Sequence, residues 1–433
     1  MPRNLSLFIA FRLLFNARFY YPIFAVVQLD YGLTMSQFAI LNALWAASII
    51  LFEVPSGALA DRIGRKRMVV LAAILMVCEM GLIAFVPLGD SQLVFWVWVL
   101  NRLLSGAAEA AASGADEALA YDSIPARQRK ERWPKVLSRL MFLSSLAFAA
   151  AMLVGAAVYD VGLVNRILAW FGIEHELGKQ TVIRFPIYLT LMTSIAALVV
   201  ACLMTEPPQA TDSGGEASVW GNVLGAGAWI LRTPIVLAII LAALVNDTVV
   251  RLFLTLNSEY YRLIGIPDAA FGIIGASSAG LGILVPKLAM RLVEKGRPAS
   301  NYLLVSALTL IGLGGVAIAW PIYGVVVVVV FSFSFGLLNF FTSHYLNAEV
   351  DSARRATVLS FKGLALNLGF GTVSLLYAGL LSGLRERGNL APSATSDPAF
   401  PASLPWLPIA FIAMSLPLFA YYQFKVRALV ASR

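Results

Sequence analysis

The sequence predicts an all-α integral membrane protein with about twelve transmembrane helices, arranged as two six-helix halves. Hydrophobic residues make up 59% of the 433 residues and charged residues only 13%, about half the charged share of a soluble domain. Apolar runs of roughly 18 or more residues, each long enough to cross a ~30 Å hydrocarbon core as a helix, recur along the chain, and nothing resembles the alternating strands of a membrane barrel. The expected spans are 5–27, 36–59, 68–88, 93–121, 137–159, 185–204, 234–256, 269–292, 301–319, 321–346, 357–383 and 406–425.

One polar segment divides these spans into six and six. Residues 205–222 read TEPPQATDSGGEASVWGN, and this richness in Pro, Gly and Ser is typical of a flexible linker. We therefore expect an N-terminal half at 1–204, a cytoplasmic linker at 205–233 and a C-terminal half at 234–433. Halves with equal numbers of spans are typical of a duplicated transporter, in which the substrate site lies near the membrane midplane between the halves.

The distribution of basic residues predicts the orientation. If the N-terminus is cytoplasmic, 20 of the 32 Lys and Arg residues fall on inner loops and tails and six on outer loops, so both termini should be cytoplasmic. Because Arg12 and Arg18 interrupt the first span and no small-residue cleavage site follows it, that span should remain in the mature protein. The net charge is +8. Because the basic residues lie on the cytoplasmic loops, we expect them to face anionic lipid headgroups and not nucleic acid. We expect an integral protein of the plasma membrane, and specifically of a bacterial inner membrane.

A charged motif lies between the second and third expected spans. Residues Gly57–Lys66 read GALADRIGRK, which resembles the pattern G-x-x-x-D-R/K-x-G-R-R/K that the major facilitator superfamily carries on the same loop. NRLLSG at 101–106 is similar to the R-x-x-x-G element of that family's fourth span, and LAMRLVEKGR at 288–297 is a degenerate counterpart in the second half. With the six-plus-six layout, the resemblance covers the whole chain and implies the fold of that superfamily.

The resemblance implies that this motif forms a cytoplasmic gate. Gly57 and Gly64 allow two helix backbones to approach closely and allow the chain to turn between the spans. Asp61 can lie at the N-terminus of a facing helix, where the helix dipole favours a negative charge. Asp122 is the best acidic partner for the arginines of the motif. The alternative is a plain basic loop that only sets topology. The expected gate residues are Gly57, Asp61, Arg62, Gly64, Arg65, Lys66, Asp122 and, at the start of the eleventh span, Arg355.

Ionisable residues within the spans are candidates for coupling to an ion, because charges inside a bilayer are costly. Steps of seven place Arg102, Glu109 and Asp116 on one face of the fourth span, and Asp247 and Arg251 are four residues apart in the seventh. We expect Glu109 and Asp247 to carry protons, with Arg102 and Arg251 as their respective tuning partners. Permanent ion pairs that hold helices together are the alternative for both acids, and sodium remains an alternative to protons.

The resemblance also implies that spans one, four, seven and ten surround the substrate cavity. Polar and aromatic side chains of these spans are therefore the cavity candidates, and the lone Glu79 of the third span is expected to pair with a residue on another helix. The cavity candidates are Arg12, Asn16, Arg18, Tyr20, Tyr21, Ser113, Asp116, Asn246, Asn339 and Ser343.

The sequence thus predicts a secondary active transporter that moves a small organic molecule by alternating access. Proton coupling is favoured because of the buried acids Glu109 and Asp247. Efflux is slightly favoured, since the aromatic residues of spans one and ten suit an amphipathic compound. The fifth span, however, lacks the G-P-x-x-G-G element of drug/proton antiporters. The alternatives are a proton-coupled importer of an organic anion and a flippase of lipid or lysolipid with the same fold.

An enzyme is not expected. The chain has two histidines, His175 and His344, no H-E-x-x-H zinc motif and no G-x-S-x-G nucleophile elbow. Cys78 and Cys202 both fall in apolar spans, so neither a disulfide framework nor a Cys-rich metal site is indicated. We expect no cofactor and no metal, and a monomer as the oligomeric state.

Overall fold

The computed structural model describes residues 3–206, 225, 227–388 and 397–427. All regular elements within these residues are helical, and nine of the helices are long and apolar enough to cross a membrane. The expected linker at 205–233 lies mostly outside the described residues. The longer elements are α1 (Arg3–Asn16), α3 (Met35–Ile63), α4 (Arg65–Phe85), α5 (Ser91–Ala112), α7 (Arg129–Tyr159), α10 (Phe185–Leu203), α12 (Pro234–Leu263), α13 (Asp268–Lys295), α14 (Pro298–Ile318), α15 (Val325–Glu349), α16 (Ser352–Gly388) and α18 (Trp406–Tyr421).

The shorter elements connect or interrupt these helices. These shorter elements are η1 (Tyr21–Ile23), α2 (Phe24–Asp30), α6 (Ala115–Asp122), η2 (Ala126–Gln128), α8 (Val161–Trp170), α9 (Lys179–Val182), α17 (Ala399–Ser403) and the π-helical η3 (Tyr422–Val426). Of these, α8 has no buried residue, and Trp170 and Phe171 at its end are largely exposed.

The described residues form two compact units. Unit 1 comprises Met1–Leu33, Leu44–Gly215 and Pro267–Ala279, and unit 2 comprises Thr34–Ala43, Glu216–Ile266 and Gly280–Arg433. Each unit has its own apolar core, and each is described here by itself.

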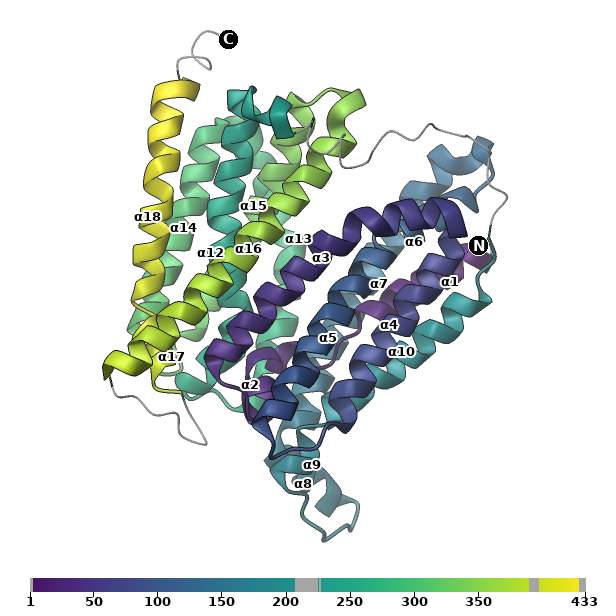
Figure 1. Cartoon of the computed structure of the whole chain (residues 1–433), viewed down its shortest axis with the longest axis vertical. Helices are drawn as coiled ribbons and strands as arrows, with labels where there is room; N and C mark the ends of the chain where they lie inside the picture. The colour runs from purple at the N-terminus through teal and green to yellow at the C-terminus, as the bar shows by residue number, and fades with distance from the viewer. Residues whose placement is uncertain (1–2, 207–224, 226, 389–396, 428–433) are drawn as a thin grey trace. The chain divides into compact units, whose positions relative to one another are not determined.

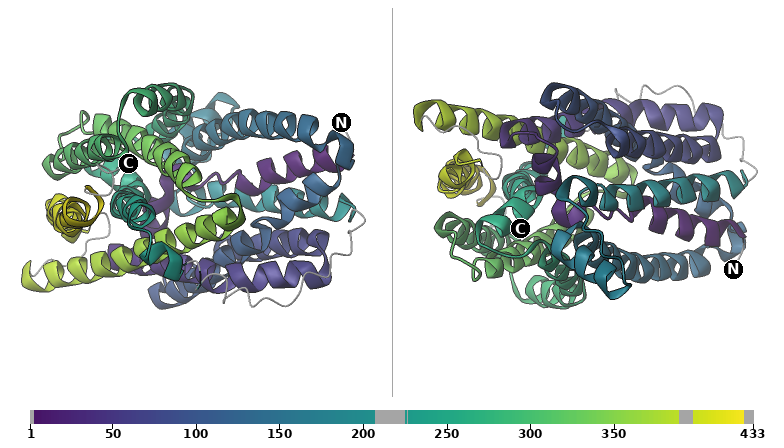
Figure 2. Two further views of the ribbon diagram at one scale, coloured as in Figure 1. Left: turned by 90° about the horizontal axis from the view of Figure 1, so that it is seen from above. Right: turned by 90° about the horizontal axis from the view of Figure 1, so that it is seen from below.

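The core of unit 1 is built on the packing of α4 against α5 and α10, which run side by side in Figures 1 and 2. Small side chains fill the contact between α4 and α5, among them Ala72 and Ala73 on one helix and Ala108 and Ala111 on the other. Small residues let helix backbones approach closely, which is the main source of packing energy between helices in lipid. This close packing fixes the helix positions from which the buried charges extend.

The core of unit 2 is built around α12, which packs against α15 and α16. Large apolar side chains dominate here, and Phe253 of α12 lies 4.6 Å from Phe331 of α15 between ring centroids. The Thr309 and Ser334 hydroxyl groups hydrogen-bond between α14 and α15 at 3.0 Å. These two buried hydroxyl groups thus satisfy each other across two helices.

The continuous helix expected over 5–27 is wrong, because this span is broken after Asn16. Pro22 has no N–H group and cannot donate to the carbonyl oxygen of Arg18, so an α-helix cannot run through this segment unbroken. The freed backbone groups find partners on α10: the Phe19 N–H donates to Thr190 Oγ1 at 3.0 Å, and the Thr193 hydroxyl donates to the Ala17 carbonyl at 3.3 Å.

The span expected over 93–121 is also broken. α5 ends at Ala112, and α6 begins only after Gly114, whose φ of 74° is left-handed and suits glycine. Asp116 therefore lies on a separate helix from Arg102 and Glu109, and the three do not share one continuous helix face.

The break in the first span depends on Gly155 of α7. A Cβ atom at this position would meet the backbone carbonyl of Phe19 directly. We expect Gly155→Ala to lower the melting temperature of the detergent-purified protein, with a cost of about 1–3 kcal/mol typical of overpacking. Gly81→Ala in α4 is the matched control, since a Cβ there meets nothing within 4 Å. A Gly155→Ala protein that melted at or above the wild-type temperature would contradict this packing.

Candidate functional site

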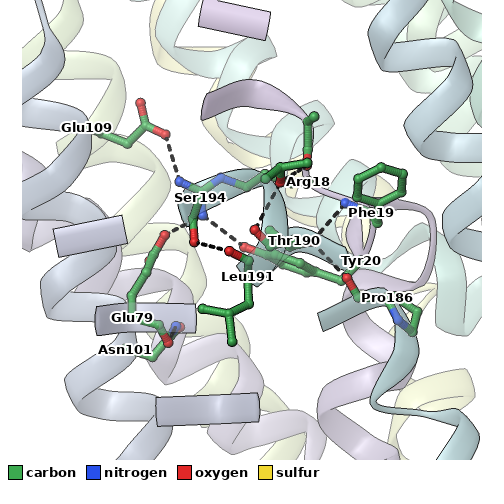
Figure 3. Close-up of polar contacts among 12 residues, drawn as sticks. Arg18, Phe19, Tyr20, Glu79, Asn101, Glu109, Pro186, Thr190, Leu191 and Ser194 are labelled. Atoms are coloured by element: carbon green, nitrogen blue, oxygen red, sulfur yellow. Dashed lines mark hydrogen bonds and ion pairs between the residues drawn. The ribbon is translucent and has the colours of Figure 1, made fainter. Parts of the chain in front are cut away.

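The broken first span places Arg18 in the interior of unit 1. The Arg18 side chain is 2% exposed and forms an ion pair with Glu79 of α4 through Nη1. Its Nη2 atom lies 3.5 Å from Oε1 of Glu109 on α5. Figure 3 shows the guanidinium between these two acids. We call Arg18, Glu79 and Glu109 the Arg18 network.

The surroundings of the Arg18 network fix its geometry. Nη1 of Arg18 also donates to the Tyr20 hydroxyl at 3.4 Å, and the guanidinium carbon lies 5.7 Å from the centre of the Phe15 ring. The Asn101 amide donates to the backbone carbonyl of Glu79 at 2.9 Å, which ties α5 to α4 at the level of the acid.

The two acids of the Arg18 network differ in exposure. Glu79 is fully buried, whereas the Glu109 side chain is 33% exposed. One guanidinium offsets the charge of one carboxylate, so the network holds an excess negative charge unless one acid carries a proton. An uncompensated buried charge is costly, and Glu109 is the acid of the network that solvent reaches.

A second network, again of one arginine and two acids, lies between α1 and α6. Nε of Arg12 lies 2.7 Å from Oδ2 of Asp116, and its Nη2 lies 3.1 Å from Oε1 of Glu117. Asp116 is fully buried and Glu117 is 49% exposed. Here too one arginine is shared by a buried and an exposed acid.

The structure does not bring Arg102 to Glu109, the pairing that the sequence suggested. Seven residues of helix separate their positions by about 10 Å along the axis, which is too far for an ion pair. Glu109 contacts Arg18 instead. The Arg102 guanidinium lies over the rings of Phe24 and Trp98, at 5.0 and 5.4 Å from their centres.

In unit 2, Asp247 and Arg251 form the ion pair that their spacing on α12 suggested. Nη2 of Arg251 lies 2.7 Å from Oδ2 of Asp247, and Nη1 donates to Oδ1 of Asn367 on α16 at 3.0 Å. Lys362 of α16 lies close enough to both charges to interact with them electrostatically. This network, unlike those of unit 1, has two cations for one acid.

The remaining cavity candidates fall into buried and exposed sets. Tyr20 and Asn246 are buried, and the Asn246 amide donates to the Ala242 carbonyl and to Ser306. Tyr21 is 37% exposed and packs edge-on against Tyr20. The other four candidates are exposed. The Asn16 and Asn339 amides donate to backbone carbonyls four residues earlier in the chain. The exposed candidates are Asn16, Ser113, Asn339 and Ser343.

Of the expected gate residues, Gly64, Arg65 and Lys66 lie at the turn between α3 and α4. Gly64 there has a φ of 96°, a conformation that favours glycine. Arg65 forms an ion pair with Asp122, the acid that the sequence favoured, and Nη2 of Arg129 lies 3.1 Å from the same carboxylate. Gly57 and Arg62 are exposed, and Lys66 is partly buried.

An unexpected acid caps this turn. The Glu206 carboxylate accepts hydrogen bonds from the backbone N–H groups of Arg65 and Lys66, at 3.0 and 2.7 Å, where the dipole of α4 favours a negative charge. The side chains of Asp61 and Arg355 lie outside the described part of the structure.

The sequence profile of the Major Facilitator Superfamily matches residues 6–374. The chain belongs to this superfamily. As a member, it is a membrane transporter that binds a small molecule, and not an enzyme. No curated protein matches its sequence significantly.

Solved structures of superfamily transporters share its fold. The nucleoside transporter NupG has a TM-score of 0.72 and 13% identity, with 98% of this chain and all of that chain covered. A bacterial homologue of the human lysosomal transporter Spinster, inward-facing and unoccupied, has a TM-score of 0.70 and 16% identity over 98% and 96% of the two chains. A D-xylose–proton symporter has a TM-score of 0.67 and 14% identity over 98% and 97%.

Sequence reasoning missed three contributors to these networks. Glu206 looked like part of a linker, and nothing local marked it as a helix cap. Lys362 could have been found, because it is an ionisable residue inside an apolar span. Asn367, five residues further on, gave no signal by itself.

The buried ion pair between Arg18 and Glu79 predicts strong energetic coupling. Replacing Glu79 with Leu leaves a buried arginine with only the more distant Glu109, which we expect to cost about 3–5 kcal/mol. Combining Glu79→Leu with Arg18→Met should recover most of that loss, measured by unfolding of the purified protein. The exposed pair of Glu131 and Lys135 on α7 is the control, with an expected coupling of about 0–1 kcal/mol. Additive effects at Arg18 and Glu79 would show that the pair is not a unit.

Proposed function

We propose that this superfamily member is a proton-coupled secondary transporter that exports a small amphipathic organic molecule by alternating access. The Arg18 network is the observation that supports proton coupling. Its one guanidinium is shared by two carboxylates, and one of them, Glu109, is partly exposed. A carrier that must take up a proton on one side and release it on the other needs an acid of this kind.

Glu109 is a better proton carrier than Asp247 on grounds of charge. Asp247 is held by Arg251 and lies near the second cation Lys362, so its negative charge is more than offset. Glu109 shares Arg18 with Glu79, so its charge is not. A proton on Glu109 therefore relieves an excess negative charge, whereas a proton on Asp247 would add to a positive charge that is already in excess. The same argument applies to sodium as the coupling ion, but a partly exposed single carboxylate offers few of the six or more oxygen ligands typical of such hard cations.

The transport cycle that we propose uses the two halves that the sequence suggests, 1–204 and 234–433, joined by the segment 205–233. Alternating access in transporters of this kind is largely a rigid-body movement of one half against the other. The charged turn at Gly64, with Arg65 and Asp122, is proposed as part of the cytoplasmic gate, with Asp61 and Arg355 as a contact that closes it. We further propose that the protein lies in the plasma membrane with both termini in the cytoplasm, as a monomer, and that lipid surrounds it without being its substrate.

Export is proposed because efflux is the direction that the sequence favours for an amphipathic substrate. Aromatic side chains suited to such a substrate lie beside the Arg18 network. Tyr20, Tyr21 and Phe24 form a cluster of aromatic rings with centroids 5.4–6.2 Å apart, and such rings bind apolar groups while nearby charges orient polar ones.

The direction and the substrate are tested by mass spectrometry of cells that express the wild type or Arg18→Met at matched surface levels. We expect a compound to accumulate in the medium only with the wild type. Depletion of a compound from the medium would contradict export and indicate an importer, and no difference in soluble compounds would favour a lipid substrate.

Proton coupling is tested with the compound found in that comparison. In proteoliposomes with a pH gradient, we expect Glu109→Gln to abolish gradient-driven accumulation while retaining exchange of the compound, because the amide keeps the shape but cannot carry a proton. Glu131→Gln, which removes an exposed acid at the start of α7, should leave both activities unchanged. Gradient-driven accumulation by Glu109→Gln at the wild-type level would contradict the role of Glu109.

A further inference from the structure

Within the described residues, Arg102 of α5 is a buried cation without a carboxylate partner. It is 4% exposed, and its Nε and Nη2 atoms have no hydrogen-bond partner among the described residues. Its contacts are the faces of Phe24 and Trp98. Cation–π contacts stabilise a desolvated arginine by about 2 kcal/mol or more, but they leave its N–H groups without the hydrogen bonds that a carboxylate would accept.

The other arginines singled out in the spans of unit 1 are neutralised by the protein itself. Arg18 is paired with Glu79 and Glu109, and Arg12 with Asp116 and Glu117. An acidic group on a substrate would therefore have to displace a carboxylate of the protein from either of them. Arg102 needs no such displacement, so it is the arginine that is free to receive an anion.

Two more buried polar side chains without partners lie on the same two helix faces. Trp98 is one turn before Arg102 on α5, and its Nε1 has no hydrogen-bond partner in the part of the chain that the structure describes. Gln28 is one turn after Phe24 on α2 and is fully buried, and within the same described residues neither its Nε2 nor its Oε1 has a hydrogen-bond partner. Residues four apart lie on the same side of a helix. Because each unsatisfied buried group costs about 1–3 kcal/mol, three such groups on facing residues point to a ligand that satisfies them.

We propose that Arg102, Trp98 and Gln28 form the subsite that binds the carboxylate end of an aromatic substrate. This inference rests on the proposed transport function and names the substrate class. Nε and Nη2 of an arginine present two parallel N–H groups that match the two oxygens of a carboxylate, the Trp98 indole and Gln28 amide supply further donors, and the Phe24 ring supplies an apolar wall. The substrate is therefore an aromatic organic acid.

The first test uses the wild-type full-length protein in detergent at neutral pH, without a gradient. Benzoate, phenylacetate and indoleacetate are compared with their neutral amides, and the melting temperature of the protein is followed as each is titrated. At least one acid should raise the melting temperature, and its amide should need an at least about tenfold higher concentration for the same effect, since a charge-assisted bidentate contact is lost. Equal effects of acid and amide, or no effect of any acid, would overturn the proposal.

Variants then locate the contact. Arg102→Gln should abolish the preference for the acid, Arg102→Lys should retain part of it because the charge remains without the fork, and Gln28→Leu should weaken binding while the cation stays in place. Arg166→Gln, which removes an exposed arginine on α8, is the control and should keep the full preference. A preference for the acid that persists in Arg102→Gln would overturn the assignment.

This binding test and the coupling test fail independently. Glu109→Gln should keep the wild-type preference for the acid over its amide, because Glu109 contacts Arg18 and not Arg102. Loss of acid preference with intact proton coupling would overturn the subsite alone, and intact acid preference with unimpaired proton-driven transport by Glu109→Gln would overturn the coupling role alone.

Discussion

The buried ion pair between Arg18 and Glu79 is the interaction on which the interior of unit 1 depends. A guanidinium buried in an apolar helix bundle is less costly when a carboxylate offsets its charge. Glu79 does so from α4, and the pair joins the broken first span to the most closely packed helices of the unit. The break itself places Arg18 there, since a continuous α-helix could not also let Thr190 of α10 receive the Phe19 N–H. Helix packing, the break and the charge pair therefore support one another.

The charge balance of each network indicates what it can do. In unit 1, Arg18 and Arg12 are each shared by one buried and one more exposed acid. Both networks therefore have an exposed carboxylate whose charge the arginine does not fully offset. Around Asp247 in unit 2 the balance is reversed, with Arg251 and Lys362 facing one acid. Arg102 stands apart, because its contacts are aromatic and no acid of the described ranges pairs with it. We therefore propose proton exchange at Glu109, beside Arg18, and anion binding at Arg102.

Several features could be read from the sequence because each depends on a local pattern. Long apolar runs predicted most of the helices, the spacing of Asp247 and Arg251 predicted their pairing, and the glycine spacing in the Gly57–Lys66 motif indicated the family. The isolated acid Glu79 was expected to pair with a residue on another helix, and it pairs with Arg18 in the break between α1 and η1. These predictions need only the period of the helix and the cost of a charge in lipid.

The remaining features depend on the tertiary structure. The break after Asn16 was missed although Pro22 was a visible signal, because the apolar run alone suggested one span. The partner of Glu109 was misassigned because spacing along α5 was taken as proximity, whereas two helical turns separate Arg102 from Glu109. Only the folded chain shows that Arg18 approaches Glu109 from the break between α1 and η1, and that Glu206 caps α4 from 140 residues away in the sequence.

The central claim is that one proton is shared within the Arg18 network and resides on Glu109. Infrared difference spectroscopy of the purified protein during a pH titration tests it directly, because a protonated carboxyl group has a C=O stretch distinct from that of a carboxylate. The account predicts a carboxyl band that appears as the pH falls, shifts in D₂O, and is missing in Glu109→Gln. The same band in Glu109→Gln, or its loss only when Glu79 is replaced by Gln, would contradict the account.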